Sequence, residues 1–134
     1  MDAIGRAEHR LGDGEGDVID RLGAWIDEMG EQARREPEDP EIRLLRSRAI
    51  ARDPDLRGLL VGHFNRAHDA IAAATAADTG QSPDAVGPQM IAAAAIAMLG
   101  VVERLAAEQS AQTREELDRG FTVLRGSLAA LKQP

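Results

Sequence analysis

The three histidines of this sequence are the side chains whose chemistry depends most on spacing. They are His9, His63 and His68. A di-iron centre in a helical bundle needs a glutamate three residues before a histidine on facing helices, and no histidine here has one. His63 and His68 lie roughly 140° apart around a helix, which prevents a shared chelate. We expect no metal site. His63 and His68 are each interpreted as a boundary residue with one nitrogen in water, or alternatively as a hydrogen-bonding group of a pocket.

The other reactive residues form no catalytic arrangement. None of the four serines stands in a nucleophile elbow, and the loop from Gly12 to Gly16 lacks the lysine and hydroxyl residue of a phosphate-binding loop. The absence of cysteine excludes disulfides, thiolate metal sites and a cysteine nucleophile. We therefore expect no catalytic residue and no cofactor, so the chain is not predicted to be an enzyme.

Charge limits the classes of partner. The chain has 23 acidic against 16 basic residues, a net charge of −7. This charge repels a phosphate backbone, so we expect no nucleic acid to bind through this chain. The N-terminus lacks the apolar segment of a signal peptide. The uncharged stretch from Ala85 to Val102 contains Pro88 and Gln89 and is marginal for a span of about 20 apolar residues. We expect no membrane partner and a cytoplasmic location.

Helix start and stop signals divide the chain. In three places a side-chain acceptor precedes a proline, which favours an N-cap followed by the first helical residue. These pairs are Asp39-Pro40, Asp53-Pro54 and Ser82-Pro83. Thr113 to Glu116 reads as a capping box, and Gly12 and Gly80 stand where glycine closes a helix.

Between these signals the apolar residues recur at helical spacing, which predicts an all-α fold of five to six helices. The expected helices cover about 2–11, 17–35, 40–52, 54–79, 88–108 and 114–131, with the fifth starting at Pro88 or already at Pro83. Only three residues are aromatic, so the core must consist of Leu, Ile, Val, Met and Ala, which suits packed helices. A length of 134 residues is that of one domain, 1–134.

The last two expected helices have more apolar surface than one core requires. Beside the stripe that faces the core, each has a second stripe, and small side chains in it allow helix backbones to approach closely. These second stripes consist of Met90, Ala94, Ala97 and Val101, and of Gly120, Val123, Ser127 and Ala130. We predict that the eight residues form the interface of a homodimer. The alternative is that both helices are central in a monomeric bundle.

Large, adaptable side chains on otherwise alanine-rich helices indicate a candidate ligand site. They are Trp25, Met29, Phe64, His68 and Met98. Such residues either fill a core or line a cavity, and a pocket needs a few polar groups, of which His68 could be one. We predict that they border a pocket for a small, mostly apolar effector. Ordinary core packing is the alternative.

Two segments resemble the regulatory domain of tetracycline-repressor (TetR) family transcription factors. Residues 51–57, Ala-Arg-Asp-Pro-Asp-Leu-Arg, precede a long amphipathic helix, and residues 76–84, Ala-Ala-Asp-Thr-Gly-Gln-Ser-Pro-Asp, lead into the alanine-rich helix at 90–99. The order of elements over nearly the whole chain is similar too. The resemblance implies that the last two helices of two subunits form a dimeric four-helix bundle and that the middle helices enclose an effector pocket.

In that family a DNA-binding helix-turn-helix precedes the connecting helix, and we expect this chain to lack it. The resemblance therefore implies an effector-binding and dimerisation domain without a DNA-binding head, either a fragment or a homologue that has lost the head. The alternative is a free-standing helical protein–protein interaction module without a small-molecule site, and a helical-bundle enzyme comes third. A pocket between the second, fourth and fifth helices would favour the first reading, and a filled core there the second.

Overall fold

The computed structural model describes residues 9–12, 14–108 and 110–133, and within them the chain is helical without any strand. The helices are α2 (Val18–Arg35), α3 (Pro40–Arg52), α4 (Pro54–Thr79), α5 (Val86–Ala107) and α6 (Thr113–Leu131). The all-α prediction is thus confirmed. Most of the expected helix at 2–11 lies outside the described residues, and only 9–12 are seen, in helical conformation.

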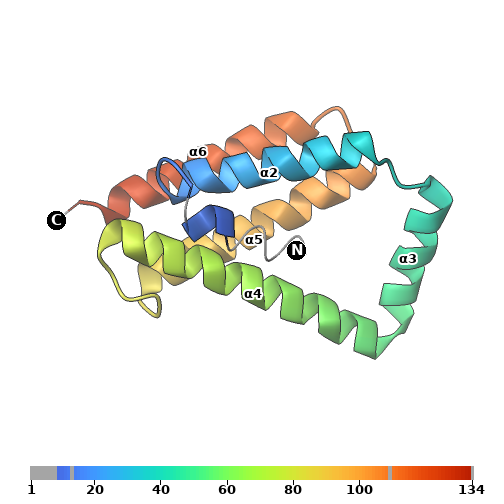
Figure 1. The fold of residues 1–134 in the computed structure, drawn as a ribbon, viewed down its shortest axis with the longest axis horizontal. Coiled ribbons are helices and arrows are strands. Elements are labelled where there is room, and N and C mark those ends of the chain that lie inside the picture. The colour runs from blue at the N-terminus through green and yellow to red at the C-terminus, as the bar shows by residue number, and fades with distance from the viewer. Residues whose placement is uncertain (1–8, 13, 109, 134) are drawn as a thin grey trace.

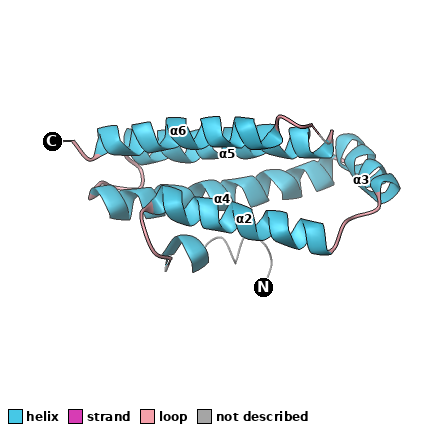
Figure 2. Cartoon of the chain, turned by 90° about the horizontal axis from the view of Figure 1, so that it is seen from above, coloured by secondary structure: helices cyan, strands magenta, loops and turns pink. Residues whose placement is uncertain are grey.

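The helices form two layers, with α5 and α6 in one and α2 and α4 in the other (Figure 2). The most extensive packing joins α4 to α5, followed by α5 to α6. The helices α2 and α4 lie close together near the start of α2 and diverge from there (Figure 1). At the far end α3 crosses the gap from the end of α2 to the start of α4 (Figure 1).

The core lies where α2, α4, α5 and α6 meet. It contains fully buried aliphatic residues from each layer, among them Leu22, Ile71 and Leu124, and buried alanines such as Ala92 and Ala95. Burying each such Leu or Ile contributes about 1.5–3 kcal/mol relative to exposure. The alanines let α5 approach its neighbours closely, so the core has the aliphatic composition expected from the sequence.

Side-chain caps fix the starts of three helices. Asp39 accepts a hydrogen bond from the N–H of Glu41 at 2.8 Å, and Asp53 accepts one from the N–H of Asp55 at 2.9 Å. Both predicted Asp-Pro starts are therefore confirmed. Asp17 and Asp20 form a reciprocal capping box at the start of α2 that was not predicted. Gly80 ends α4 in the left-handed region with φ of 68°, as expected for a closing glycine.

Two predicted N-caps are wrong, although α5 and α6 begin close to where the sequence placed them. Ser82 and Pro83 begin a turn, in which the Ser82 hydroxyl accepts from the N–H of Asp84 at 3.3 Å, and α5 begins only at Val86. Pro88 fits inside the first turn of α5 because N–H groups there have no partner within the helix. Thr113 does not cap α6, since its hydroxyl donates to the carbonyl of Ser110 at 2.8 Å.

A buried ion pair, called here the clasp, joins the start of α2 to the end of α4. Asp78 of α4 accepts hydrogen bonds from the backbone N–H of Val18 at 2.6 Å and from Nη2 of Arg21 at 2.9 Å. The Arg21 side chain is 10% exposed and that of Asp78 is 19% exposed. Removing one partner of such a pair leaves the other charge buried and uncompensated. The clasp therefore sets the place at which the two helices meet.

Replacing Asp78 with Ala should lower the free energy of unfolding by about 3 kcal/mol, the cost of leaving a buried charge unpaired. Urea denaturation followed by circular dichroism would measure it. The matched control is Asp118→Ala, which removes an exposed carboxylate 3.3 Å from Arg114 and should cost less than about 0.5 kcal/mol. Equal losses in the two variants would show that the clasp does not hold α2 on α4.

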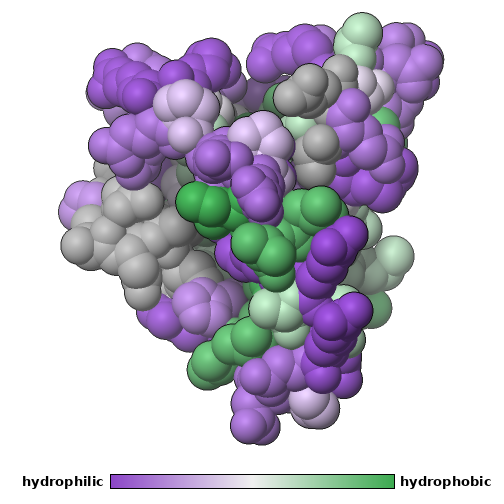
Figure 3. Space-filling model, turned by 90° about the vertical axis from the view of Figure 1, so that its right-hand side faces the viewer, coloured by the Kyte–Doolittle hydropathy of each residue, from purple (hydrophilic) through white to green (hydrophobic). Residues whose placement is uncertain are grey.

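The opposite end of the molecule has no comparable packing. No residue of α3 is buried. Across α3 and the first half of α4, seven large apolar side chains are 37–63% exposed, and they are called here the α3-end patch: Ile42, Leu44, Leu45, Leu56, Leu59, Leu60 and Val61. Seen from this end, apolar side chains gather in the middle of the face among polar ones (Figure 3). Exposed apolar surface of this extent is typical of a binding site.

Candidate functional site

The five residues predicted to border a pocket fall into two groups. Trp25 and Met98 are 5% and 8% exposed and belong to the core cluster, and Met29 packs against that cluster. Phe64 and His68 are half-buried on α4 and lie outside it. The structure thus places three of the five in, or against, the same core cluster. The pocket itself stays a prediction.

The indole of Trp25 has a feature that the sequence could not reveal. Its Nε1 atom is buried, and it has no hydrogen-bond acceptor among the described residues. A buried donor without a partner costs about 1–3 kcal/mol. Such a donor beside half-buried apolar side chains is a suitable anchor for an acceptor atom of a ligand.

The side chain of His68 is partly exposed, which is compatible with both predicted readings. Its side chain is 26% exposed, and its Nδ1 atom lies 3.5 Å from the Asp69 carboxylate. A contact of this length between neighbouring residues becomes an ion pair only when the histidine is protonated. Over the part of the chain that the structure describes, no cluster of three metal-ligating side chains occurs.

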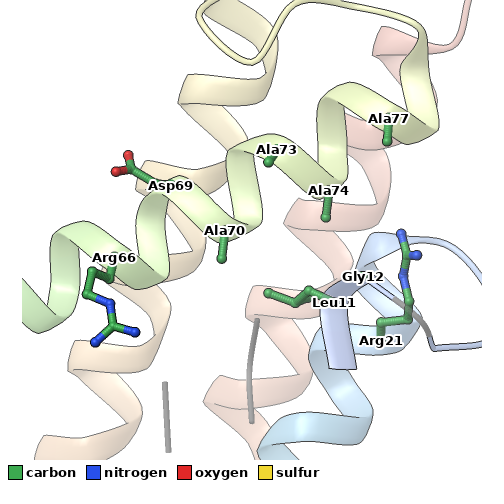
Figure 4. A pocket seen from close by; sticks show the side chains of 9 residues that line it. All are labelled: Leu11, Gly12, Arg21, Arg66, Asp69, Ala70, Ala73, Ala74 and Ala77. Carbon is green, nitrogen blue, oxygen red and sulfur yellow. The ribbon is translucent and has the colours of Figure 1, made fainter. Parts of the chain in front are cut away.

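A groove runs between the end of the first helix, α2 and α4 (Figure 4). It has a volume of about 510 Å³ and is called here the alanine groove, lined by Leu11, Gly12, Arg21, Arg66, Asp69, Ala70, Ala73, Ala74 and Ala77. Leu11 and Arg21 face the α4 alanines across the groove (Figure 4). None of the five predicted pocket residues lines it. Sequence reasoning missed it because α4 and the first helix are far apart in the chain.

A second, polar hollow lies between α2 and α6. Arg125 contacts the Asp20 carboxylate at 2.9 Å, and Arg114 lies 3.8 Å from Asp27. The hydrogen bond from Arg125 is the largest cause that lowers the pKa of Asp20 below its ordinary value. All four side chains are largely exposed, so these pairs orient α2 on α6 and add little stability. Nothing in this hollow points to a ligand.

The outer face of α5 and α6 is apolar and uncovered. Met90, Val101 and Val123 are 65%, 40% and 62% exposed. Of the other predicted interface residues, four are exposed as well: Ala94, Ala97, Ser127 and Ala130. The Ser127 hydroxyl donates to the carbonyl of Val123 at 2.9 Å. Its hydrogen-bonding need is therefore met within α6, and the face can pack against an apolar partner.

The length and composition of α5 would also allow it to cross a membrane. The segment that is long and apolar enough is Val86–Ala106, and 39% of its apolar stretch is buried inside the domain. That buried part packs on α4 and α6, as the core helix of a bundle does, and the rest includes the uncovered face with Met90 and Val101. Packing on α4 and α6 explains the apolar composition of the buried part of α5 without a bilayer.

Gly120 differs from the other predicted interface residues. A Cβ atom added there would lie 2.3 Å from Sδ and 2.6 Å from Cγ of Met98. Gly120 is half-buried and faces α5 of its own chain. The absence of a side chain is thus required by the α5–α6 contact within the chain.

Replacing Gly120 with Ala should lower the free energy of unfolding by about 1–3 kcal/mol, because the new methyl group overpacks against Met98. The matched control is Gly126→Ala on the same helix, where an added Cβ meets no atom within 4 Å. This control should raise stability by up to about 1 kcal/mol through helix propensity. Thermal and urea unfolding of the two variants would separate the effects, and a stabilised Gly120→Ala would contradict the assignment.

The helix order and the two-layer packing are those of an all-α regulatory domain of the TetR type. A family model described as the MftR C-terminal domain, one of the TetR C-terminal domains, matches residues 10–129. The chain is therefore a TetR-family C-terminal domain. Within that class it belongs to the family of MftR C-terminal domains. Comparison with curated proteins and with solved structures gave no significant match.

Proposed function

We propose that this domain binds a small, mostly apolar effector and forms a homodimer, as the sensing part of a cytoplasmic transcriptional regulator. The observation that supports the proposal is that some apolar surfaces of the domain are buried, whereas others are exposed to solvent. The start of α2 is closed against α4 by the clasp, whereas the α3-end patch and the outer face of α5 and α6 are uncovered. Membership of the TetR C-terminal domains makes effector and partner subunit the expected occupants.

The effector site is proposed where α2 and α4 diverge. Trp25, Met29 and Met98 supply a buried apolar wall, and Phe64 and His68 lie on α4 toward the α3-end patch. The unpaired Nε1 of Trp25 and the ring of His68 would orient the ligand. A ligand that binds more tightly at one separation of α2 and α4 shifts the population toward that separation. This shift would signal that the ligand is bound.

Catalysis and direct DNA binding are not part of the proposal. The reactive side chains form no catalytic arrangement in the sequence, and a net charge of −7 disfavours contact with phosphates. The domain would act on DNA only through a segment or partner that reads it.

Hydrophobic small molecules should change the fluorescence of Trp25, the only tryptophan, in a saturable way and raise the melting temperature. Phe64→Ala should weaken the affinity for such a ligand roughly tenfold, about 1.4 kcal/mol. Because Phe64 is only half-buried, its truncation should cost less than about 2 kcal/mol of stability. Titrations of both proteins with the best compound of a screen would measure this.

A control for this experiment is Val86→Ala, which truncates a side chain that is 75% exposed at the start of α5. It should leave affinity and stability unchanged. A structure in which the five predicted side chains pack against one another without a void would defeat the pocket, and so would equal affinities for the wild-type protein and the Phe64 variant.

The dimer is proposed through the uncovered face of α5 and α6. In the described residues, that face combines exposed alanines with Met90, Val101 and Val123 and contains a serine whose hydroxyl is already bonded within its helix. A two-fold axis would bring the same face of a second copy against it. Gly120 would contribute from the inside, by setting how closely α6 lies on α5.

Replacing Val123 with Glu should raise the dissociation constant of the dimer at least tenfold, because the dimer would bury an unpaired charge. In the monomer position 123 is 62% exposed, so the fold should tolerate the charge. The matched control is Ala129→Glu, at an exposed position of α6 away from both stripes. Sedimentation or light scattering would give the masses. A wild-type chain that stays monomeric at high micromolar concentration would remove the dimer from the proposal.

A further inference from the structure

Met90 differs from the other methionines that the structure describes in how far solvent reaches it. Met90 is 65% exposed, whereas Met98 is 8% exposed and Met29 is half-buried against the core cluster. The sulfur atom of Met98 also lies against Gly120 of α6. Because an oxidant must reach the sulfur atom, exposure decides which methionine it oxidises first. Met90 is therefore the methionine most open to oxidation in the described part of the chain.

Met90 belongs to the uncovered face of α5 and α6. The start of α5 lies beside the end of α6, because a Cβ atom added at Gly87 would lie 2.6 Å from Cδ2 of Leu131. At this end the other residues of the predicted interface are small: Ala94, Ser127 and Ala130. The thioether of Met90 therefore stands among short side chains, where the same face of a second copy would cover it.

The predicted interface residues provide no free side-chain donor for an oxidised Met90. A hydroperoxide transfers one oxygen atom to the sulfur: the O–O bond breaks, the sulfur loses two electrons, and hydrogen peroxide is reduced to water. The product has an S=O group that accepts hydrogen bonds. Ser127 has the only hydroxyl among the predicted interface residues, and it already donates to the carbonyl of Val123 at 2.9 Å. Between two copies the sulfoxide would be buried without a partner, whereas in the monomer water donates to it.

We propose that Met90 is an oxidation site and that its sulfoxide separates the two copies of the dimer. The inference rests on the proposed function, because it requires the outer face of α5 and α6 to be the contact between copies. The dimer covers Met90, so a hydroperoxide reacts with the monomer, and the oxidised chain no longer pairs tightly. Oxidation at this residue changes the oligomeric state without unfolding the domain, since the Met90 side chain is largely in water in the monomer.

Hydrogen peroxide at a fixed excess, followed by peptide mass spectrometry of the wild-type protein, tests the site. Met90 should form its sulfoxide before Met29 and Met98 do, as their exposure dictates. Raising the protein concentration from below to well above the dissociation constant of the dimer should slow the oxidation of Met90 roughly threefold or more, because the dimer covers the sulfur. Earlier oxidation of Met98, or a rate independent of protein concentration, overturns the proposal.

Sedimentation measures the effect on the dimer. Oxidation of Met90 should raise the dissociation constant roughly tenfold, and methionine sulfoxide reductase should restore it, because the enzyme returns the thioether. Met90→Leu keeps an apolar side chain of similar volume without sulfur, so this variant should dimerise and be insensitive to peroxide. The matched control is Met29→Leu, at a residue that packs against the core, which should stay sensitive. Helical circular dichroism should stay the same throughout.

The outcomes separate this inference from the proposed function. A reduced wild-type chain that stays monomeric at high micromolar concentration removes the dimer from the proposed function, and this inference with it. A wild-type dimer whose dissociation constant does not change when Met90 is converted to the sulfoxide overturns this inference alone. Equal dissociation of the wild-type protein and Met90→Leu after peroxide also overturns it, because the change would then come from another residue.

Discussion

The architecture depends on the contact between Asp78 and the start of α2. One carboxylate accepts the N–H of Val18, which begins α2, and also neutralises Arg21 one turn later. Because α2 and α4 are joined there and diverge beyond it, α3 must bridge the gap between them at the opposite end (Figure 1). The alanine groove adjoins the clasp through Arg21, and the α3-end patch lies where the divergence is greatest. The groove and the uncovered α3-end patch thus both follow from this one joint.

The helices could be predicted from the sequence because their ends are set by local chemistry. Asp39, Asp53 and Gly80 act on backbone groups within a few residues, and all three do in the structure what their types predicted. The same reasoning failed at Ser82 and Thr113, where an equally local partner competes. Ser82 accepts from Asp84 in a turn, and Thr113 donates to Ser110. The residue type indicates that a side-chain hydrogen bond forms, but the partner of that bond decides whether it caps the helix: α6 begins at Thr113 without a side-chain cap.

The candidate sites could be predicted only in part, because periodicity tells which face a residue occupies and not what lies opposite. It correctly separated the buried stripe of α5 from the exposed one that contains Met90 and Val101. It could not show that Gly120 faces Met98 of its own chain, or that the indole of Trp25 lacks an acceptor. The alanine groove was invisible for the same reason, since it is formed by segments distant in sequence.

The lack of any buried residue in α3 has a consequence for the dynamics of the domain. The helix is held by its Asp39 cap and by contacts of Arg43 and Arg46 with Glu38, all close in sequence. A helix of 13 residues is marginal on its own in water, so α3 can open while the core stays folded. Its amides should exchange with solvent faster than those of α5. A protease that cleaves after arginine should therefore cut first within α3, where the opened chain offers several such bonds.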